Sequence, residues 1–186
     1  MIPGTCPVGC CGSTVNPCNF MLVAATNPCP CGFYNDPVHQ CTCTKSAIDR
    51  YHAKMSGPVL DRIDIQINVD PVAFDDLDKA KDGETSAVIR DRVNKAREIQ
   101  KNRFKGTGIY KNSDMTEAMM EKYCPLNEES KAVLKLAFEK LGLSARSYNR
   151  ILKVSRTIAD LEGSTDIEKD HILKAIRLRR NVAFDE

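Results

Sequence analysis

Four cysteines stand in two closely spaced pairs early in the chain. The pairs are Cys29-x-Cys31 and Cys41-x-Cys43, and the nine residues between them include His39. Thiolates are preferred ligands of zinc, and a closed tetrahedral set of four leaves no open position for catalysis. The pattern therefore predicts a structural zinc site. The alternatives are His39 in place of one thiolate, iron in place of zinc, and four reduced thiols without metal.

An acid and a base, Asp61 and Arg62, follow the string SGPVL directly before a second apolar run. An arginine supplied across a subunit boundary stabilises the charge of a transferring phosphoryl group, which is worth a factor of ~10³ or more in rate. A guanidinium suits this task because it is planar and permanently charged. A local ion pair with Asp61 or Asp64 is the commoner role of such an arginine. Both interpretations stay open on these residues alone.

Two apolar runs predict buried strands. The run Phe20–Ala25 is short and ends in Thr26-Asn27-Pro28, which is typical of a parallel strand, and Ile63–Val69 predicts another. Asn27 would then lie at the carboxyl end of a strand, where ligands bind in open α/β sheets, and its amide could orient a water molecule or a phosphate oxygen. The alternative is that Asn27 only caps a turn before the proline.

Helical patterns lie on both sides of the acidic stretch 71–83, one before it and five after it. The sequence predicts helices over 45–55, 85–104, 113–123, 128–141, 144–162 and 167–180. Ser144 is the expected cap of the fifth, and Arg146 falls in its first turn, where free N–H groups favour an anion. Arg150 follows one turn later. These arginines predict phosphate recognition, and two solvated arginines at helical spacing are the alternative.

Composition narrows the class of protein. The chain has 186 residues, of which 42% are hydrophobic and 28% charged, with a net charge of +2, so no overall field demands a nucleic-acid partner. No apolar run approaches the ~20 residues that span a bilayer, and no secretion signal is recognisable. We therefore expect a cytoplasmic protein without a membrane partner, whose nine cysteines are reduced or bind metal. Residues 85–105 carry seven basic and two acidic side chains, which indicates either a contact with DNA phosphates or a solvated basic face.

The strings MLVAATNPCPCG and RYHAKMSGPVLDRIDIQINV, with the cysteine loop between them, resemble the magnesium-chelatase-like AAA+ ATPases of the ComM/YifB branch. The resemblance runs from about Thr14 to about Arg177 and covers the C-terminal half of that family. It implies an ATP-driven, homo-oligomeric ring, expected to be a hexamer, that acts on DNA in branch migration during natural transformation and recombination. The implied fold is α/β plus all-α, with the C-terminal part of a parallel-sheet AAA+ core followed by a helical lid bundle.

The resemblance also implies roles for single residues. Asn27 matches the sensor-1 asparagine near the γ-phosphate, and Arg62, beside Asp61, matches the arginine finger between ring neighbours. Arg146 matches the sensor-2 arginine, with Arg150 as the fallback. ATP and Mg²⁺ would be held mainly by Walker motifs. Because no G-x-x-x-x-G-K-[ST] string occurs in the chain, we expect a C-terminal fragment that does not hydrolyse ATP alone.

The expected organisation has four parts. Residues 1–13 are unmatched and expected to lack order, and 14–72 form the α/β part with the cysteine loop 29–43. Residues 73–106 form a linker and a basic helical insertion, and 107–186 the lid. Two other functions remain as hypotheses. One is a magnesium chelatase ATPase subunit that inserts magnesium into a porphyrin, which the cysteine loop argues against; the other is a non-enzymatic, zinc-bearing DNA-binding module.

Overall fold

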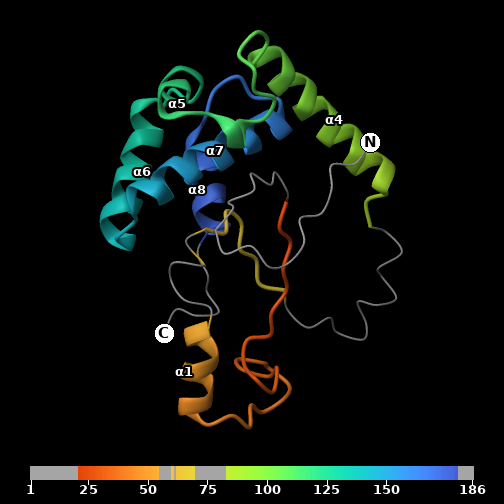
Figure 1. Ribbon diagram of the computed structural model, residues 1–186, viewed down its shortest axis with the longest axis vertical. Helices are drawn as coiled ribbons and strands as arrows, with labels where there is room; N and C mark the ends of the chain where they lie inside the picture. The colour runs from red at the N-terminus through yellow and green to blue at the C-terminus, as the bar shows by residue number, and fades with distance from the viewer. Residues whose placement is uncertain (1–20, 55–59, 61, 70–82, 180–186) are drawn as a thin grey trace, which may run out of the picture.

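The computed structural model describes residues 21–54, 60, 62–69 and 83–179. The elements within these ranges are α1 (Lys45–Lys54), α4 (Ser86–Arg103), the 3₁₀ turn η2 (Asn112–Asp114), α5 (Glu117–Tyr123), α6 (Glu128–Leu141), α7 (Ala145–Glu162) and α8 (Lys169–Arg177). Figure 1 shows α4 to α8 gathered at one end of the long axis, and α1 with the cysteine-bearing loop at the other. No described helix has the length and apolar character needed to cross a membrane. Asp61 and residues 1–13, for which predictions were made, lie outside the described ranges.

Side-chain caps fix where the long helices begin. Thr85 accepts a hydrogen bond from the Val88 N–H at 3.4 Å, and Asn127 accepts one from the Ser130 N–H at 2.8 Å. The hydroxyl of Ser144 likewise accepts from the N–H of Ser147 at 3.2 Å, which confirms it as the cap of α7. These caps satisfy N–H groups that have no partner within the helix. The expected bounds of α4, α6 and α7 are confirmed to within one residue.

Two helical predictions were wrong in their bounds. The helix expected over 113–123 is divided, because Met115 is buried in an extended conformation and Thr116 then caps a shorter helix, α5. The last helix begins at Lys169 rather than 167. Ile167 is instead fully buried and forms an isolated parallel bridge with Leu126. Burial of a single apolar side chain thus overrides the local helical pattern in both places.

The residues that the structure describes do not form the two predicted buried strands. Residues 21–25 and 63–69 have no regular secondary structure, and Met21, Val23 and Ile67 are 87%, 82% and 69% exposed. A strand needs neighbours to satisfy its N–H and C=O groups, and no described segment pairs with either run as a strand. The described fold is therefore helical, and burial of these two runs was predicted wrongly for this chain.

Helix α7 organises the helical domain. It packs against α8, α4, α5 and η2, and α6 packs on α8. The core includes Phe104, Leu134, Ile151 and Ile172, each at most 2% exposed. Within α4 only Ala96 and Gln100 are buried, so the amino-terminal half of that helix projects away from the core. The domain therefore presents α7 as a rigid central element and α4 as a largely solvated one.

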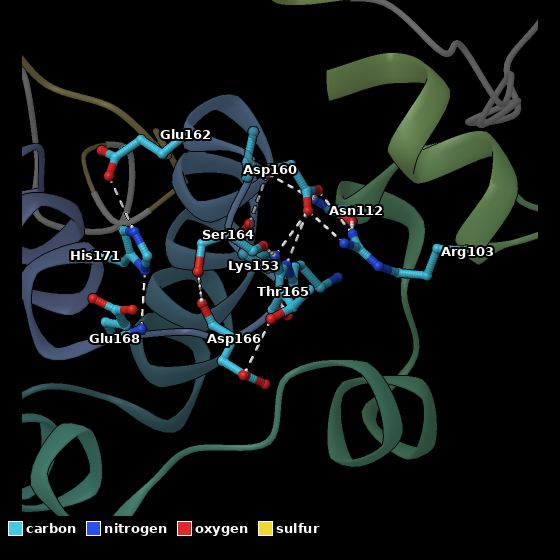
Figure 2. Close-up of polar contacts among 12 residues, drawn as sticks. Arg103, Asn112, Lys153, Asp160, Glu162, Ser164, Thr165, Asp166, Glu168 and His171 are labelled. Atoms are coloured by element: carbon cyan, nitrogen blue, oxygen red, sulfur yellow. Dashed lines mark hydrogen bonds and ion pairs between the residues drawn. The ribbon is translucent and has the colours of Figure 1, made fainter. Parts of the chain in front are cut away.

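A buried carboxylate joins three parts of this domain (Figure 2). Asp160, with no exposed side-chain surface, accepts hydrogen bonds from Asn112 at 2.8 Å and from Arg156 at 3.0 Å, and it also pairs with Arg103 from the end of α4. The other guanidinium nitrogens of Arg156 donate to the carbonyl oxygens of Thr165 and Ser164. The network ties α4, η2 and the loop after α7 to α7 itself. We infer that Asp160 has a structural role, because the side chains that bind its carboxylate all belong to the helical domain.

Candidate functional site

The four paired cysteines come together in space. Their Sγ atoms all lie within 4.8 Å of one another. The Cys29 sulfur is 3.3 Å from that of Cys31 and 3.7 Å from that of Cys41, and the sulfurs of Cys31 and Cys41 are 3.5 Å apart. Four thiolates placed ~2.3 Å from a central zinc ion in a tetrahedron would be about 3.8 Å apart. All four are free thiols, so the spacing fits a metal-binding cluster.

The loop around the thiols is shaped by local backbone contacts. The N–H of Gly32 donates to the carbonyl oxygen of Cys29 at 3.0 Å, and Gly32 adopts a φ of 88°, which favours glycine. Asp36 accepts hydrogen bonds from the backbone of Val38 and His39 at 2.8 and 2.6 Å. Both turns reverse the chain and bring the second thiol pair back to the first.

Two histidines flank the thiols without joining them. Among the described residues, the group that could hold a metal ion consists of the four cysteines. His39 is not part of it, and its ring lies against Phe33 with centroids 4.9 Å apart. The Nε2 of His52, on α1, lies 2.7 Å from the carbonyl oxygen of Pro28. His52 thus ties α1 to the start of the loop, and the structure favours cysteine ligands over His39.

The thiols differ in acidity. Backbone N–H groups of Phe33 and Thr42 lower the pKa of Cys31 to about 5, because they stabilise its thiolate. Burial raises the pKa of Cys43 to about 12. One thiolate therefore forms readily while a neighbour resists ionisation. A divalent cation at the centre would remove this conflict by stabilising all the thiolates together.

Arg62 lies on an exposed segment that is attached to the helical domain. The guanidinium Nη1 of Arg150 donates to the backbone carbonyl oxygen of Arg62 and to a carboxylate oxygen of Asp64, both at 2.5 Å. Arg179, just after α8, donates to the carbonyl oxygen of Ile63 at 3.0 Å. Arg62 and Arg150, predicted separately as site residues, are thus brought together. In this arrangement Arg150 supports the segment that carries Arg62.

The remaining predicted site residues are dispersed. Asn27 is exposed two residues before the first thiol, and Arg146 is exposed in the first turn of α7. Within the described ranges no hydrogen bond joins Asn27 to Arg146. The roles predicted for Asn27, Arg62, Arg146 and Arg150 in nucleotide binding therefore stay predictions.

Several basic side chains of α4 form ion pairs within the chain. Arg103 turns inward to Asp160, and Arg92 forms a two-pronged ion pair with Glu84 at 2.9 and 3.0 Å. Two further pairs run along the helix, Lys95 with Asp91 at 2.8 Å and Lys101 with Glu98 at 3.6 Å. The exposed bases outside these pairs are Arg90, Arg97 and Lys105.

The helical domain and the preceding segment match two related family models. Residues 83–179 match magnesium chelatase, subunit ChlI C-terminal, and residues 11–77 match magnesium chelatase, subunit ChlI. Because the first model covers more than half of the chain, the chain belongs to the magnesium chelatase family, a family of AAA+-like ATPases. The helical fold of 83–179 is the C-terminal domain of that family.

Two curated relatives indicate the branch within the family. The chain is 44% identical to the competence protein ComM of Haemophilus influenzae over 167 residues, which are 89% of this chain and 32% of ComM. It is 37% identical to the uncharacterized protein YifB of Escherichia coli over 164 residues, 88% of this chain and 31% of YifB. The chain thus falls in the ComM/YifB branch, as its motifs indicated, and it spans about a third of the length of these relatives.

Three residues with structural roles could not be singled out from the sequence. Asp160 and Arg156 are buried on α7, and Arg179 donates to the carbonyl oxygen of Ile63. The four-residue spacing of Arg156 and Asp160 is the one signal available in advance, because i,i+4 pairs of opposite charge face each other on a helix.

Proposed function

We propose that this chain is the part of a ComM-like, ring-forming ATPase that senses ATP in its own subunit and completes the ATP site of a neighbour. The ring would be a homo-oligomer, expected to be a hexamer, that uses ATP and Mg²⁺ to move DNA during branch migration in natural transformation and recombination. Membership of the ComM/YifB branch is the observation that carries the proposal. The Walker motifs would come from sequence that this chain does not contain.

Arg62 is proposed as the finger that reaches the neighbouring subunit. Arg62 is exposed, and its backbone carbonyl oxygen accepts a hydrogen bond from Arg150. This contact fixes the backbone from which the Arg62 side chain extends. Phosphoryl transfer develops charge on the γ-phosphate oxygens, and a permanently charged, planar guanidinium stabilises that charge. Asp61 precedes Arg62 in the sequence and is proposed to assist at the same interface.

Asn27 and Arg146 are proposed to read the nucleotide of their own subunit. Asn27 would orient the attacking water with its neutral amide. Arg146, in the first turn of α7, would meet a phosphate near backbone N–H groups that already favour an anion. The two extended apolar runs at 21–25 and 65–69 would pair with further strands of an AAA+ sheet core, which would bring Asn27 to the edge of that sheet.

The thiol cluster is proposed to hold a structural zinc ion through Cys29, Cys31, Cys41 and Cys43. The Sγ spacings of 3.3 to 3.7 Å among Cys29, Cys31 and Cys41, with the Sγ of Cys43 within 4.8 Å of them, support a tetrahedral site with four protein ligands. Such a site would fix the loop that follows Asn27, since ligation energy is also folding energy for a segment without its own core. Zinc here would have no catalytic role.

DNA is proposed as the substrate of the ring, with α4 as its contact in this chain. Arg90 and Arg97 remain exposed on α4, and Lys105 remains exposed in the turn that follows it. Phosphate contacts by a few such side chains give weak, salt-sensitive binding. A ring would multiply that binding by placing several copies of the helix along one DNA molecule.

Complementation of ATPase activity tests the proposal. The full chain is mixed with ComM of Haemophilus influenzae in which the arginine matching Arg62 is replaced by alanine, so that ATP can be bound but the finger is missing. The proposal predicts that the chain restores ATP hydrolysis and that its Arg62→Ala variant does not. Restoration by both variants alike would refute the role of Arg62.

A further inference from the structure

The segment that carries Arg62 is held by two arginines from different parts of the helical domain. Arg150 of α7 donates to the carbonyl oxygen of Arg62, and Arg179, after α8, donates to the next carbonyl oxygen, that of Ile63. The N–H of Gln66 donates to the carbonyl oxygen of Leu178 at 2.6 Å. Three backbone groups between residues 62 and 66 are thus bound to the amino-terminal half of α7 and to the residues that follow α8.

We propose that Arg150 and Arg179 form a clamp that sets how Arg62 is presented, so that the helical domain of one subunit controls the finger offered to the next. The inference rests on the proposed function of Arg62 as that finger. In this scheme Arg150 is a positioning residue rather than the fallback sensor, and it acts together with Arg179 through the backbone of the finger segment.

The clamp restrains the segment at two adjacent peptide groups. A guanidinium offers several N–H donors in a fixed fork, and Arg150 uses Nη1 for both a carbonyl oxygen and the Asp64 carboxylate. Arg179 is itself held, because its Nη2 donates to the hydroxyl of Ser147 at 3.1 Å. Fixing the carbonyl groups of residues 62 and 63 limits rotation of the backbone at Ile63 and holds the peptide group that directly follows the Cα of Arg62.

The same helix carries both the proposed sensor and the clamp. Arg150 lies four residues after Arg146 on α7, and residues four apart share one face of a helix. The neighbouring Ile151 and Leu152 are buried, so α7 moves as part of the helical domain. A shift of α7 caused by a phosphate at Arg146 would therefore move the backbone of Arg62 through Arg150. ATP in one subunit would thereby adjust catalysis in the next.

Two measurements on the full chain test the clamp. The first is amide hydrogen exchange of residues 63–66, which needs no nucleotide. The second is the ATPase complementation described above, with kcat and KM for ATP measured separately. Arg150→Ala and Arg179→Ala remove the clamp, and Arg150→Lys keeps its charge without the fork. Asp64→Asn weakens the contact with Arg150 by changing the finger segment and leaves the helical domain unaltered. Arg177→Ala is the matched control, because Arg177 is an exposed base in the last turn of α8.

We expect Arg150→Ala to speed exchange of the Gln66 amide and to lower the restored kcat about tenfold, with KM for ATP unchanged, because a charge-assisted hydrogen bond is lost. Arg150→Lys should be intermediate and Arg177→Ala unchanged. Unchanged exchange in both alanine variants, or faster exchange with full complementation, would overturn the clamp. If the unaltered chain restores no ATPase activity, the proposed role of Arg62 and its control by the helical domain are both refuted. Amide hydrogen exchange then still shows whether Arg150 and Arg179 restrain residues 63–66.

Discussion

Replacing Asp160 with asparagine should strongly destabilise the helical domain. The carboxylate accepts four hydrogen bonds, two from Arg103 and one each from Asn112 and Arg156. Asparagine keeps one acceptor oxygen and turns an NH₂ group toward the remaining donors. Arg156 and Arg103 have side chains only 2% and 13% exposed, so their charges would be left buried without a counter-charge.

Breaking a buried ion pair from one side costs about 3–5 kcal/mol. A domain of this size has a free energy of unfolding of roughly 5–15 kcal/mol, so the loss would be a large fraction of the total. The measurement is urea unfolding of the unaltered and Asp160→Asn chains, followed by circular dichroism of the helices. Asp91→Asn is the matched control, since Asp91 forms an exposed ion pair with Lys95 on α4. Its loss should stay below about 1 kcal/mol. A loss for Asp160→Asn within about 1 kcal/mol of the control would refute the reasoning.

Three further predictions concern pH, metal and backbone. Burial alone would raise the pKa of Asp160, but hydrogen bonds from Arg103 and Asn112 outweigh burial and lower the pKa below its ordinary value. The stability that Asp160 contributes is therefore complete above about pH 4 and is lost as the pH falls through the lowered pKa. Acid titration of the Asp160→Asn variant should lack this part of the loss. Metal analysis should find about one zinc ion per chain, and Cys31→Ser should lower that content, whereas Cys124→Ser, a buried thiol outside the cluster, should leave it unchanged. Equal zinc content in both variants would contradict the site. Gly142→Ala should cost about 1 kcal/mol in urea unfolding, because Gly142 ends α6 at a φ of 57° that alanine adopts with strain, and an unchanged midpoint would contradict this.

Local patterns predicted the helical part of the fold well. Asn127 and Ser144 could be recognised as caps because their side chains bond N–H groups only three residues away, and Gly142 because a left-handed residue commonly ends a helix. These contacts depend on a few consecutive residues, so the sequence contains all the information needed to place them.

Contacts between distant residues could not be predicted in the same way. The pair Arg103 and Asp160 is separated by 57 residues, and Arg179 binds a carbonyl 116 residues away. Arg103 therefore looked like one more base of a solvated stripe. The strands expected at the two apolar runs failed for a related reason, since pairing is a property of the neighbouring chain segments as well as of the run itself.

In the candidate site, too, contacts between residues close in the sequence could be predicted and contacts between distant residues could not. The thiol cluster was predictable because its two pairs are separated by a short loop, so bringing the four sulfurs together costs little conformational entropy. The contact of Arg150 with the Arg62 segment was not, because 88 residues separate the two. Sequence motifs marked both arginines as functional, and the fold supplied the relation between them.

The most direct test of the central claim is the rate of ATP hydrolysis by ComM of Haemophilus influenzae lacking its own finger arginine, measured with saturating amounts of this chain. The account predicts that the unaltered chain raises kcat by a factor of ~10³ or more, and that Arg62→Ala and Arg62→Lys do not, because only arginine offers the planar fork. Equal stimulation by the unaltered and Arg62→Ala chains would contradict it.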